Sequence, residues 1–248
     1  IFAILWSIFA YIVSIIFWYL ILTLLLGKKS KWVFFIWEYF IYSFIIGVVF
    51  IGWMLFIYWL LGIPFSFPTI SIGMMILWGL LGYYIYKKEI APEYKKLSLP
   101  IEPPRVKILL LFFFILLGTK ISIWAADILT TPTYYDDVFV NWNLRAKIFY
   151  EHEGLILDKA DPEFLGTWYV QYPLTPYLYK TFIAIFSWGW HEGAVNFPSF
   201  LFFVVTLVLI YYISLRITNS KYLSLLWPYI LSSIPLYFIH GTSPYMDV

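Results

Sequence analysis

Long apolar runs alternate with short polar segments along the chain, and six of these runs are long enough to cross a bilayer as helices. A transmembrane helix needs about 17 to 25 mostly apolar residues, because each residue adds about 1.5 Å to its length. The six runs cover residues 2–26, 39–61, 70–86, 108–125, 198–215 and 222–239. We therefore expect an all-α, polytopic membrane protein with about six transmembrane helices and further helices beside the membrane.

A seventh apolar run, 174–189, contains Pro176 near its start and Lys180 in its middle. Its short length and this lysine favour an interfacial or re-entrant helix that returns to the side from which it came. A re-entrant backbone is tolerated only where protein or a water-filled cavity satisfies its polar groups. We expect this run to lie at the outer face of the membrane.

Basic residues are concentrated in three of the loops between the predicted spans. Loops 27–31, 87–107 and 214–221 hold 11 of the 16 Lys and Arg residues, whereas segment 126–171 holds eight acidic and three basic residues. Cytoplasmic loops of membrane proteins are enriched in Lys and Arg, so the basic loops are expected in the cytoplasm and the acidic segment outside the cell membrane. The opening run lacks a basic n-region and a cleavage site, so it is expected to be a span and not a signal peptide.

The densest polar stretch, 134–147, follows the fourth span of a chain that is 62% hydrophobic and only 12% charged. On an α-helix Asp137, Asn141 and Arg145 fall within roughly an 80° arc. The neighbouring apolar stripe consists of Val138, Trp142 and Phe149. The pattern predicts a short helix whose polar face meets water or a cavity and whose apolar stripe meets the membrane. A simpler alternative is that Asp136 or Asp137 caps a solvated helix.

Several short motifs follow one another in the second half of the chain. They are Asp136-Asp137, Trp142-Asn143-Leu144-Arg145-Ala146-Lys147, Tyr172-Pro173-Leu174, Phe197-Pro198 and His240-Gly241-Thr242-Ser243-Pro244-Tyr245-Met246-Asp247. This order resembles the GT-C glycosyltransferases, the multi-spanning enzymes that include protein O-mannosyltransferases and aminoarabinose lipid A transferases. The resemblance covers residues 108–248, with an extracytoplasmic loop at 126–197. Residues 1–107 match no motif and form an N-terminal three-span region, and we expect the chain to be truncated at its C-terminus.

The resemblance implies transfer of a hexosyl or pentosyl group from a polyprenyl-phosphate donor to a lipid, glycan or protein acceptor at the extracytoplasmic face, with inversion. Asp137 is expected to act as general base, with Asp136 as the alternative. Basic groups would stabilise the leaving phosphate. The expected substrate-binding residues are Asn141, Trp142, Arg145, Lys147, Tyr172, Lys180, His240, Tyr245 and Asp247.

The sequence assigns no metal ligands and no certain cofactor. The chain has no cysteine, which excludes disulfides and cysteine metal sites. His-Glu-Gly occurs at 152–154 and 191–193, where a glycine at a helix C-cap is a better explanation than a metal site. A divalent metal held with Asp247 is left open. Membrane lipids are expected partners, and nucleic acid is not.

Two other classes of function remain. A transporter or flippase of lipid-linked sugars would place charges near the middle of the membrane on broken helices. The acidic residues of this chain instead lie in predicted outer loops, which favours the enzyme. The third possibility is a non-catalytic membrane subunit whose loop binds a partner.

Overall fold

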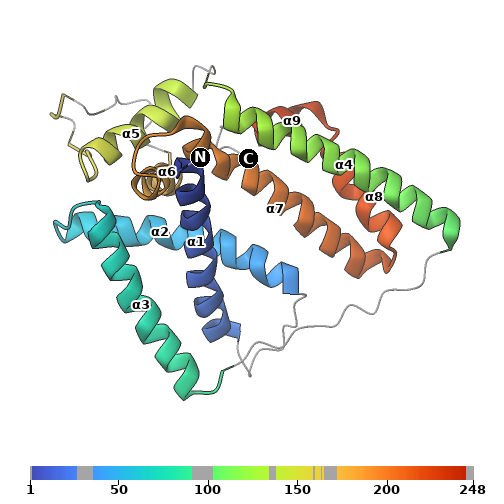
Figure 1. The fold of residues 1–248 in the computed structure, drawn as a ribbon, viewed down its shortest axis with the longest axis horizontal. Coiled ribbons are helices and arrows are strands. Elements are labelled where there is room, and N and C mark those ends of the chain that lie inside the picture. The colour runs from blue at the N-terminus through green and yellow to red at the C-terminus, as the bar shows by residue number, and fades with distance from the viewer. Residues whose placement is uncertain are drawn as a thin grey trace. The chain divides into compact units, whose positions relative to one another are not determined.

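The computed structural model describes residues 2–26, 36–90, 103–133, 138–158, 160–162, 164 and 172–243. Over these ranges the chain is helical and contains no strand, which confirms the predicted all-α class. The chain forms two compact units (Figure 1).

Unit 1 combines residues Ile1–Lys95 with Tyr134–Val195, and unit 2 combines Lys96–Thr133 with Asn196–Val248. The helices of unit 1 are α1 (Phe2–Leu26), α2 (Ile36–Leu60), α3 (Phe67–Lys87), the π-helix η1 (Val138–Asn143), α5 (Leu144–Glu151) and α6 (Leu174–Phe186). The helices of unit 2 are α4 (Pro104–Thr130), α8 (Lys221–Leu231) and α9 (Pro235–Thr242), together with α7 (Glu192–Thr218), whose first turn belongs to unit 1.

Four described helices, α2, α3, α4 and α7, are long and apolar enough to cross a membrane, and a fifth span results if α8 and α9 count as one. Helix α1 is apolar as well over Ile8–Leu24. These helices indicate a membrane-embedded protein. The predicted count of six is not confirmed, because this part of α1 is shorter than the other spans and because the last predicted span is divided between α8 and α9, whose axes differ by 79°.

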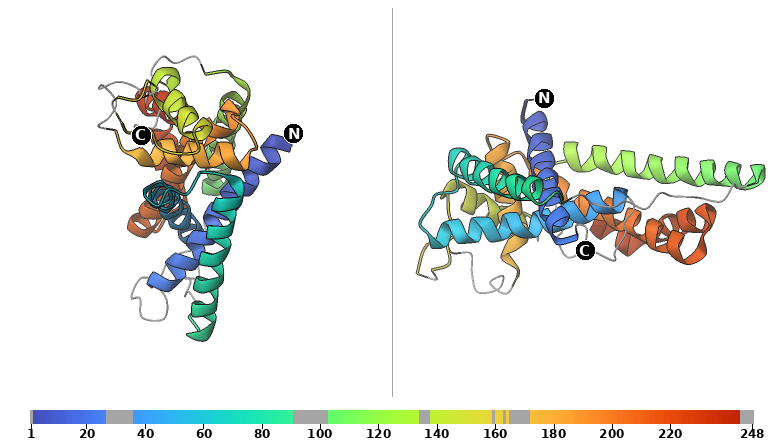
Figure 2. Two further views of the ribbon diagram at one scale, coloured as in Figure 1. Left: turned by 90° about the vertical axis from the view of Figure 1, so that its left-hand side faces the viewer. Right: turned by 90° about the horizontal axis from the view of Figure 1, so that it is seen from below.

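The break between α8 and α9 has a local cause in the sequence. Pro235 begins α9, and proline cannot donate the backbone hydrogen bond that would continue α8. Lys120 of α4 points to this break: its Nζ donates to Ser233 Oγ at 2.7 Å and lies 4.8 Å from the ring centre of Tyr229. Figure 2 (right) shows α4 itself as one straight helix.

Helix α6 lies at the centre of unit 1. Figure 1 shows α1 crossing α2, with α6 viewed nearly end-on beside them, and α6 contacts α1, α2, α5 and η1. Every residue from Tyr177 to Phe186 is buried. With 13 residues, α6 is too short to cross a membrane, and neighbouring helices cover it on all sides.

The end of α6 is fixed by an aromatic cluster. Trp188 adopts a left-handed backbone conformation with φ of 56°, the position where a helix usually ends in glycine. The N–H of Gly189 donates to Ala184 O at 3.1 Å, which closes the last turn. The Trp188 ring lies 4.9 Å from that of Phe67 and 6.0 Å from that of Trp6. Packing of this ring holds the strained residue in place and joins the first turns of α1 and α3 to the end of α6.

Candidate functional site

The polar stretch after α4 does not begin as an α-helix. Residues Val138–Asn143 form a π-helix, whose wider turn changes the face on which each side chain lies, and α5 continues from it. Asn141 and Arg145 are only 1% and 5% exposed, whereas Phe139 is 57% exposed. Of the two surroundings expected for the polar face, water is therefore ruled out for Asn141 and Arg145, and a cavity stays a prediction.

The apolar stripe differs from the expectation as well. Val138, Trp142 and Phe149 are buried in unit 1, where the stripe contacts α6. The stripe is buried because α6 is apolar on several faces, and η1 and α5 pack against one of these faces.

Hydrogen bonds connect three residues of α6 to η1 and α5. Tyr177 Oη donates to Asn141 Oδ1 at 2.8 Å, and Lys180 Nζ donates to Asn143 Oδ1 at 2.8 Å. One residue further along α6, Thr181 Oγ1 donates to the carbonyl oxygen of Ala146 at 3.0 Å. We call these side chains, Asn141, Asn143, Tyr177, Lys180 and Thr181, the polar seam.

Aromatic rings and a guanidinium surround the polar seam. The indole of Trp142 stacks on the Tyr177 ring, with centres 5.1 Å apart and planes inclined by 20°. The centre of the Tyr172 ring lies 5.1 Å from that of Trp142, with planes inclined by 60°. The Arg145 guanidinium carbon lies 4.8 Å from the centre of the Tyr177 ring, a cation–π distance. The structure thus brings together Asn141, Trp142, Arg145, Tyr172 and Lys180, all of which were predicted to bind substrate.

Burial changes the acid–base chemistry of Lys180. Its side chain is fully buried, and loss of water around the ammonium lowers its pKa to about 7. Near neutral pH the group therefore exists in both protonation states. As an ammonium it can stabilise an anion, and as an amine it can accept a proton.

Asn141 has one unsatisfied donor. Its Oδ1 accepts from Tyr177, but its Nδ2 has no hydrogen-bond partner within the described ranges although the residue is almost fully buried. Leaving a buried donor unpaired costs about 1–3 kcal/mol. An oxygen atom of a bound ligand would recover that energy, so the amide is a candidate binding group.

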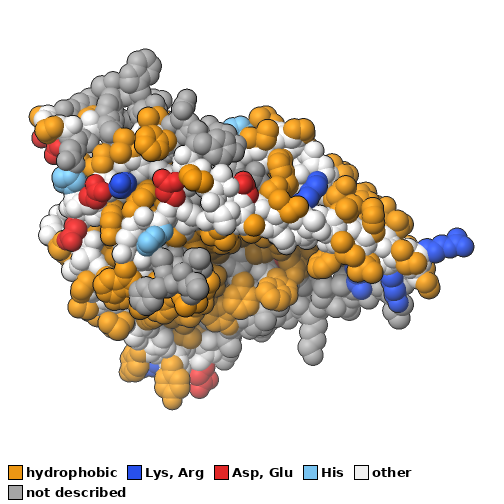
Figure 3. Space-filling view, turned by 45° about the horizontal axis from the view of Figure 1, so that its top comes forward, with side chains coloured by type: hydrophobic (Ala, Val, Ile, Leu, Met, Phe, Trp, Pro, Cys, Tyr) orange, Lys and Arg blue, Asp and Glu red, His pale blue; other side chains and the backbone are white. Residues whose placement is uncertain are grey.

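A hollow of about 360 Å³ with both polar and apolar walls lies at the end of α5. Among its lining residues are Ser66, Tyr150, Glu151, Glu153 and Trp188. The N–H of Phe65 donates to Glu153 O at 2.7 Å and joins the turn before α3 to the end of α5. Figure 3 shows acidic and histidine side chains gathered over α5 on a surface that is otherwise largely hydrophobic. No sequence pattern predicts this hollow, because its walls come from three segments that are distant in the chain.

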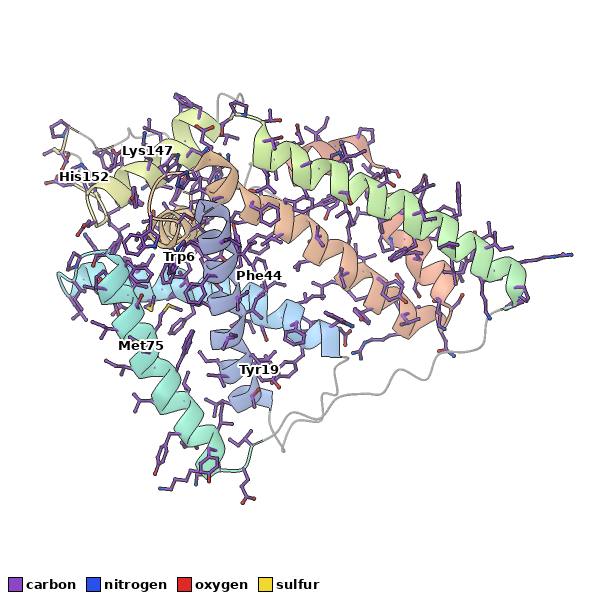
Figure 4. The ribbon with its side chains drawn as sticks, viewed as in Figure 1. Trp6, Tyr19, Phe44, Met75, Lys147 and His152 are labelled. Carbon is purple, nitrogen blue, oxygen red and sulfur yellow. The ribbon has the colours of Figure 1, made fainter. Side chains whose placement is uncertain are left out.

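Lys147 is separate from the polar seam. It is exposed and forms an ion pair of 3.8 Å with Glu151, one turn further along α5. Figure 4 shows Lys147 and His152 on the outer side of α5, away from α1 and α2. Its predicted role in substrate binding stays a prediction.

The two His-Glu-Gly segments differ from the glycine C-cap that was expected for both. At the end of α5, Glu153 and not Gly154 has the left-handed conformation, with φ of 51°. The second segment lies at the start of α7, since Glu192 is the first residue of that helix. The described residues contain no group of three or more acidic, histidine or cysteine side chains that could hold a metal ion.

The remaining predicted site residues are not part of the described cluster. His240 lies in α9 of unit 2 and is half-buried. Asp136, Asp137, Tyr245 and Asp247 lie outside the described residues.

Three partners of the predicted residues, Asn143, Tyr177 and Thr181, were not among the residues predicted from the sequence. A helical-spacing signal was present, because Tyr177, Lys180 and Thr181 share one face of α6. Comparison with known proteins adds no relative: no protein-family model, no curated protein and no solved structure matches this chain.

Proposed function

We propose that this protein is a GT-C-type glycosyltransferase that moves a sugar from a polyprenyl-phosphate donor to a lipid, glycan or protein acceptor. The observation that carries the proposal is the cluster around the polar seam. It gathers two cations, Arg145 and Lys180, an unsatisfied amide of Asn141 and the stacked ring of Trp142. The acidic pair Asp136-Asp137 immediately precedes η1 in the chain.

The proposed reaction assigns one task to each kind of group. The carboxylate of Asp137 takes the proton of the acceptor hydroxyl while that oxygen bonds to the anomeric carbon. The bond from the anomeric carbon to the phosphate oxygen breaks on the opposite face, which inverts the centre. The phosphate leaves with the bonding electrons, and Arg145 and Lys180 stabilise its charge. An approaching anion also favours the ammonium form of Lys180.

The proposed topology has six spans in the cell membrane, with the site on the extracytoplasmic side. Contacts inside unit 1 support this arrangement. Trp6, Phe67 and Trp188 lie together, and the turn at Phe65 is bonded to Glu153. The charge pattern assigns all of these segments to one side of the membrane, whereas Lys87 and Lys88 are at the far end of α3.

The test is the Asp137→Asn variant of the intact protein, assayed with a polyprenyl-phosphate sugar. General-base catalysis is typically worth about 10²- to 10⁴-fold, so turnover should fall by that order while donor binding changes far less. If Asp137 only caps a helix, Asn replaces it at little cost, because Asn and Asp cap about equally well. Arg145→Ala should weaken donor binding as well as turnover.

Asp158→Asn is the matched control for this substitution. Asp158 is exposed, and its Oδ1 accepts from the N–H of Ala160 at 2.9 Å, a role that an Asn oxygen can fill. Its turnover should stay close to that of the unaltered protein. Near-normal transfer by both Asp136→Asn and Asp137→Asn would remove the proposed base and with it the proposal.

One observation favours a second candidate, a transporter of lipid-linked sugars. The break between α8 and α9, with Lys120 bonded to Ser233 beside it, has the broken helix and intramembrane charge that transporters use. An enzyme forms the glycosylated product from donor and acceptor in detergent solution. A transporter forms none and only moves the donor across sealed vesicles.

A further inference from the structure

Unit 2 contains an apolar groove between three of its helices. The groove has a volume of about 560 Å³, within the usual range for ligand sites, and opens between α4, α7 and α8. Its walls include Phe114 and Leu117 of α4, Val204 and Val208 of α7, and Leu225 of α8. We call it the α4–α7–α8 groove.

Positive charge marks one end of this groove. Lys221, the first residue of α8, lines the groove itself. Arg105 and Lys107 lie in the first turn of α4, and Arg216 lies in the last turn of α7. Leu110 and Tyr212 line the same groove as Lys221 and lie within one to two helical turns of these cations in sequence. Figure 3 shows Lys and Arg side chains at the right-hand end of the view, where α4 begins and α7 ends in Figure 1.

The depth of the groove corresponds to one leaflet of a bilayer. On α4 its lining runs from Leu110 to Ile121. The eleven steps between these residues, at about 1.5 Å each, give a length of about 16 Å, roughly half of the hydrocarbon core of about 30 Å. The groove thus begins near the basic end of α4 and extends about 16 Å along the span, a length comparable to one leaflet.

We propose that the α4–α7–α8 groove binds an acyl chain of an anionic phospholipid from the leaflet on the basic side, with Lys221 beside the headgroup phosphate. The occupant follows from the two features of the groove. Its walls match a hydrocarbon chain, and the cations at its mouth match a negative headgroup. This inference goes beyond the proposed glycosyl transfer and does not depend on it.

The first test compares phosphatidylglycerol with phosphatidylcholine on the intact protein by native mass spectrometry. The unaltered protein should retain phosphatidylglycerol in preference to phosphatidylcholine. Lys221→Gln should weaken phosphatidylglycerol binding about fivefold, since one basic residue near a membrane surface contributes that much. Lys88→Gln is the control, because Lys88 is an exposed basic residue at the end of α3 in unit 1. Equal effects of the two substitutions would mean unspecific attraction and would overturn the proposal.

The second test fills the groove. Val208→Trp places an indole inside it and should abolish retention of phosphatidylglycerol. Ile213→Trp, at an exposed position of the same helix that does not line the groove, should leave retention unchanged.

A third test uses the unaltered protein and a phosphatidylglycerol with a photoreactive acyl chain. It should label peptides from 110–121 and 204–212. Labelling that is spread evenly over all apolar helices, or absent because a protein segment fills the groove, would contradict the proposal.

Discussion

Lys180 is the residue at which burial has the largest consequence. Its ammonium is removed from water at the centre of unit 1, and the Asn143 side-chain oxygen accepts a hydrogen bond from it. A buried lysine of this kind costs stability whenever it is charged, and such groups are retained mostly where function needs them. Its pKa of about 7 makes the cost strongly dependent on pH.

The pH dependence of folding stability therefore reports on Lys180. Below pH 7 the lysine is charged in both states, and the folded protein bears the full cost. Between about pH 7 and pH 10 the unfolded chain binds one proton more, so stability rises with pH. Relative to Lys180→Met, the unaltered protein should gain about 2 kcal/mol between about pH 7 and pH 9.

This difference can be measured by chemical denaturation in detergent, followed by tryptophan fluorescence. The bond to Asn143 is missing in Lys180→Met at every pH, so only the titration of the amine changes the difference. Lys147→Met is the control, because the Lys147 side chain is solvated in the folded and unfolded chain. A stability difference that stays constant over this interval would show that Lys180 does not titrate there.

The hydroxyl of Tyr177 should matter more than that of its neighbour Tyr179. Both side chains are fully buried on α6, but Tyr177 bonds Asn141 at 2.8 Å and Tyr179 bonds Ser14 at 3.4 Å. Tyr177→Phe leaves Asn141 without its bonded partner and should cost about 1–3 kcal/mol of unfolding free energy. Tyr179→Phe should cost about 0.5 kcal/mol. Equal losses in the same denaturation assay would argue against the polar seam.

At the scale of elements, the crossing of α2 and α6 depends on a glycine. A Cβ atom added at Gly52 would lie 3.0 Å from Thr175 Cγ2 and 3.3 Å from Thr175 Cα. Two helices approach this closely only where one of them lacks a side chain. The crossing holds α6 in contact with η1 and α5, and it therefore fixes the position of the polar seam.

Gly52→Ala and Gly79→Ala should have opposite effects on stability. Alanine at Gly52 forces the helices apart and should cost about 1–3 kcal/mol in spite of its better helix propensity. At Gly79 of α3 an added Cβ meets nothing within 4 Å, so alanine should be neutral or stabilise by up to about 1 kcal/mol. Thermal unfolding in detergent measures both changes. Thr175→Ser removes the closest methyl group and should restore part of the stability of Gly52→Ala; no recovery would mean that the contact is unimportant.

At the scale of the whole molecule, the distribution of charge and the helix contacts support the same membrane orientation of unit 1. The α5 end of unit 1 carries acidic and histidine side chains (Figure 3). The opposite end of α3 carries Lys87 and Lys88. Membrane insertion favours this asymmetry, because loops rich in Lys and Arg are retained in the cytoplasm.

Single cysteines can test the topology, since the chain has none of its own. His191→Cys should react with a membrane-impermeant reagent added from outside intact cells, and Lys88→Cys should react only after the membrane is opened. Both positions are exposed. The opposite pattern would reverse the membrane orientation and place the polar seam on the cytoplasmic side.

The sequence alone determined the helical class, most of the membrane helices and the short length of α6. These features depend on the spacing and length of apolar runs, which each segment carries by itself. It also indicated Asn141, Trp142 and Arg145 as candidate residues through the concentration of polar groups at 134–147, and Tyr172 and Lys180 through the motifs of the GT-C resemblance and its need for phosphate-binding cations.

Only the tertiary structure decided how those residues meet. The burial of Asn141 and Arg145 requires α6 to lie against η1 and α5, and the hollow at the end of α5 requires the turn before α3 to reach Glu153. The break between α8 and α9 likewise divides a run that is apolar enough for one span. Contacts between distant segments depend on the shapes of both segments. The apolar periodicity of one segment does not specify which other segment packs against it.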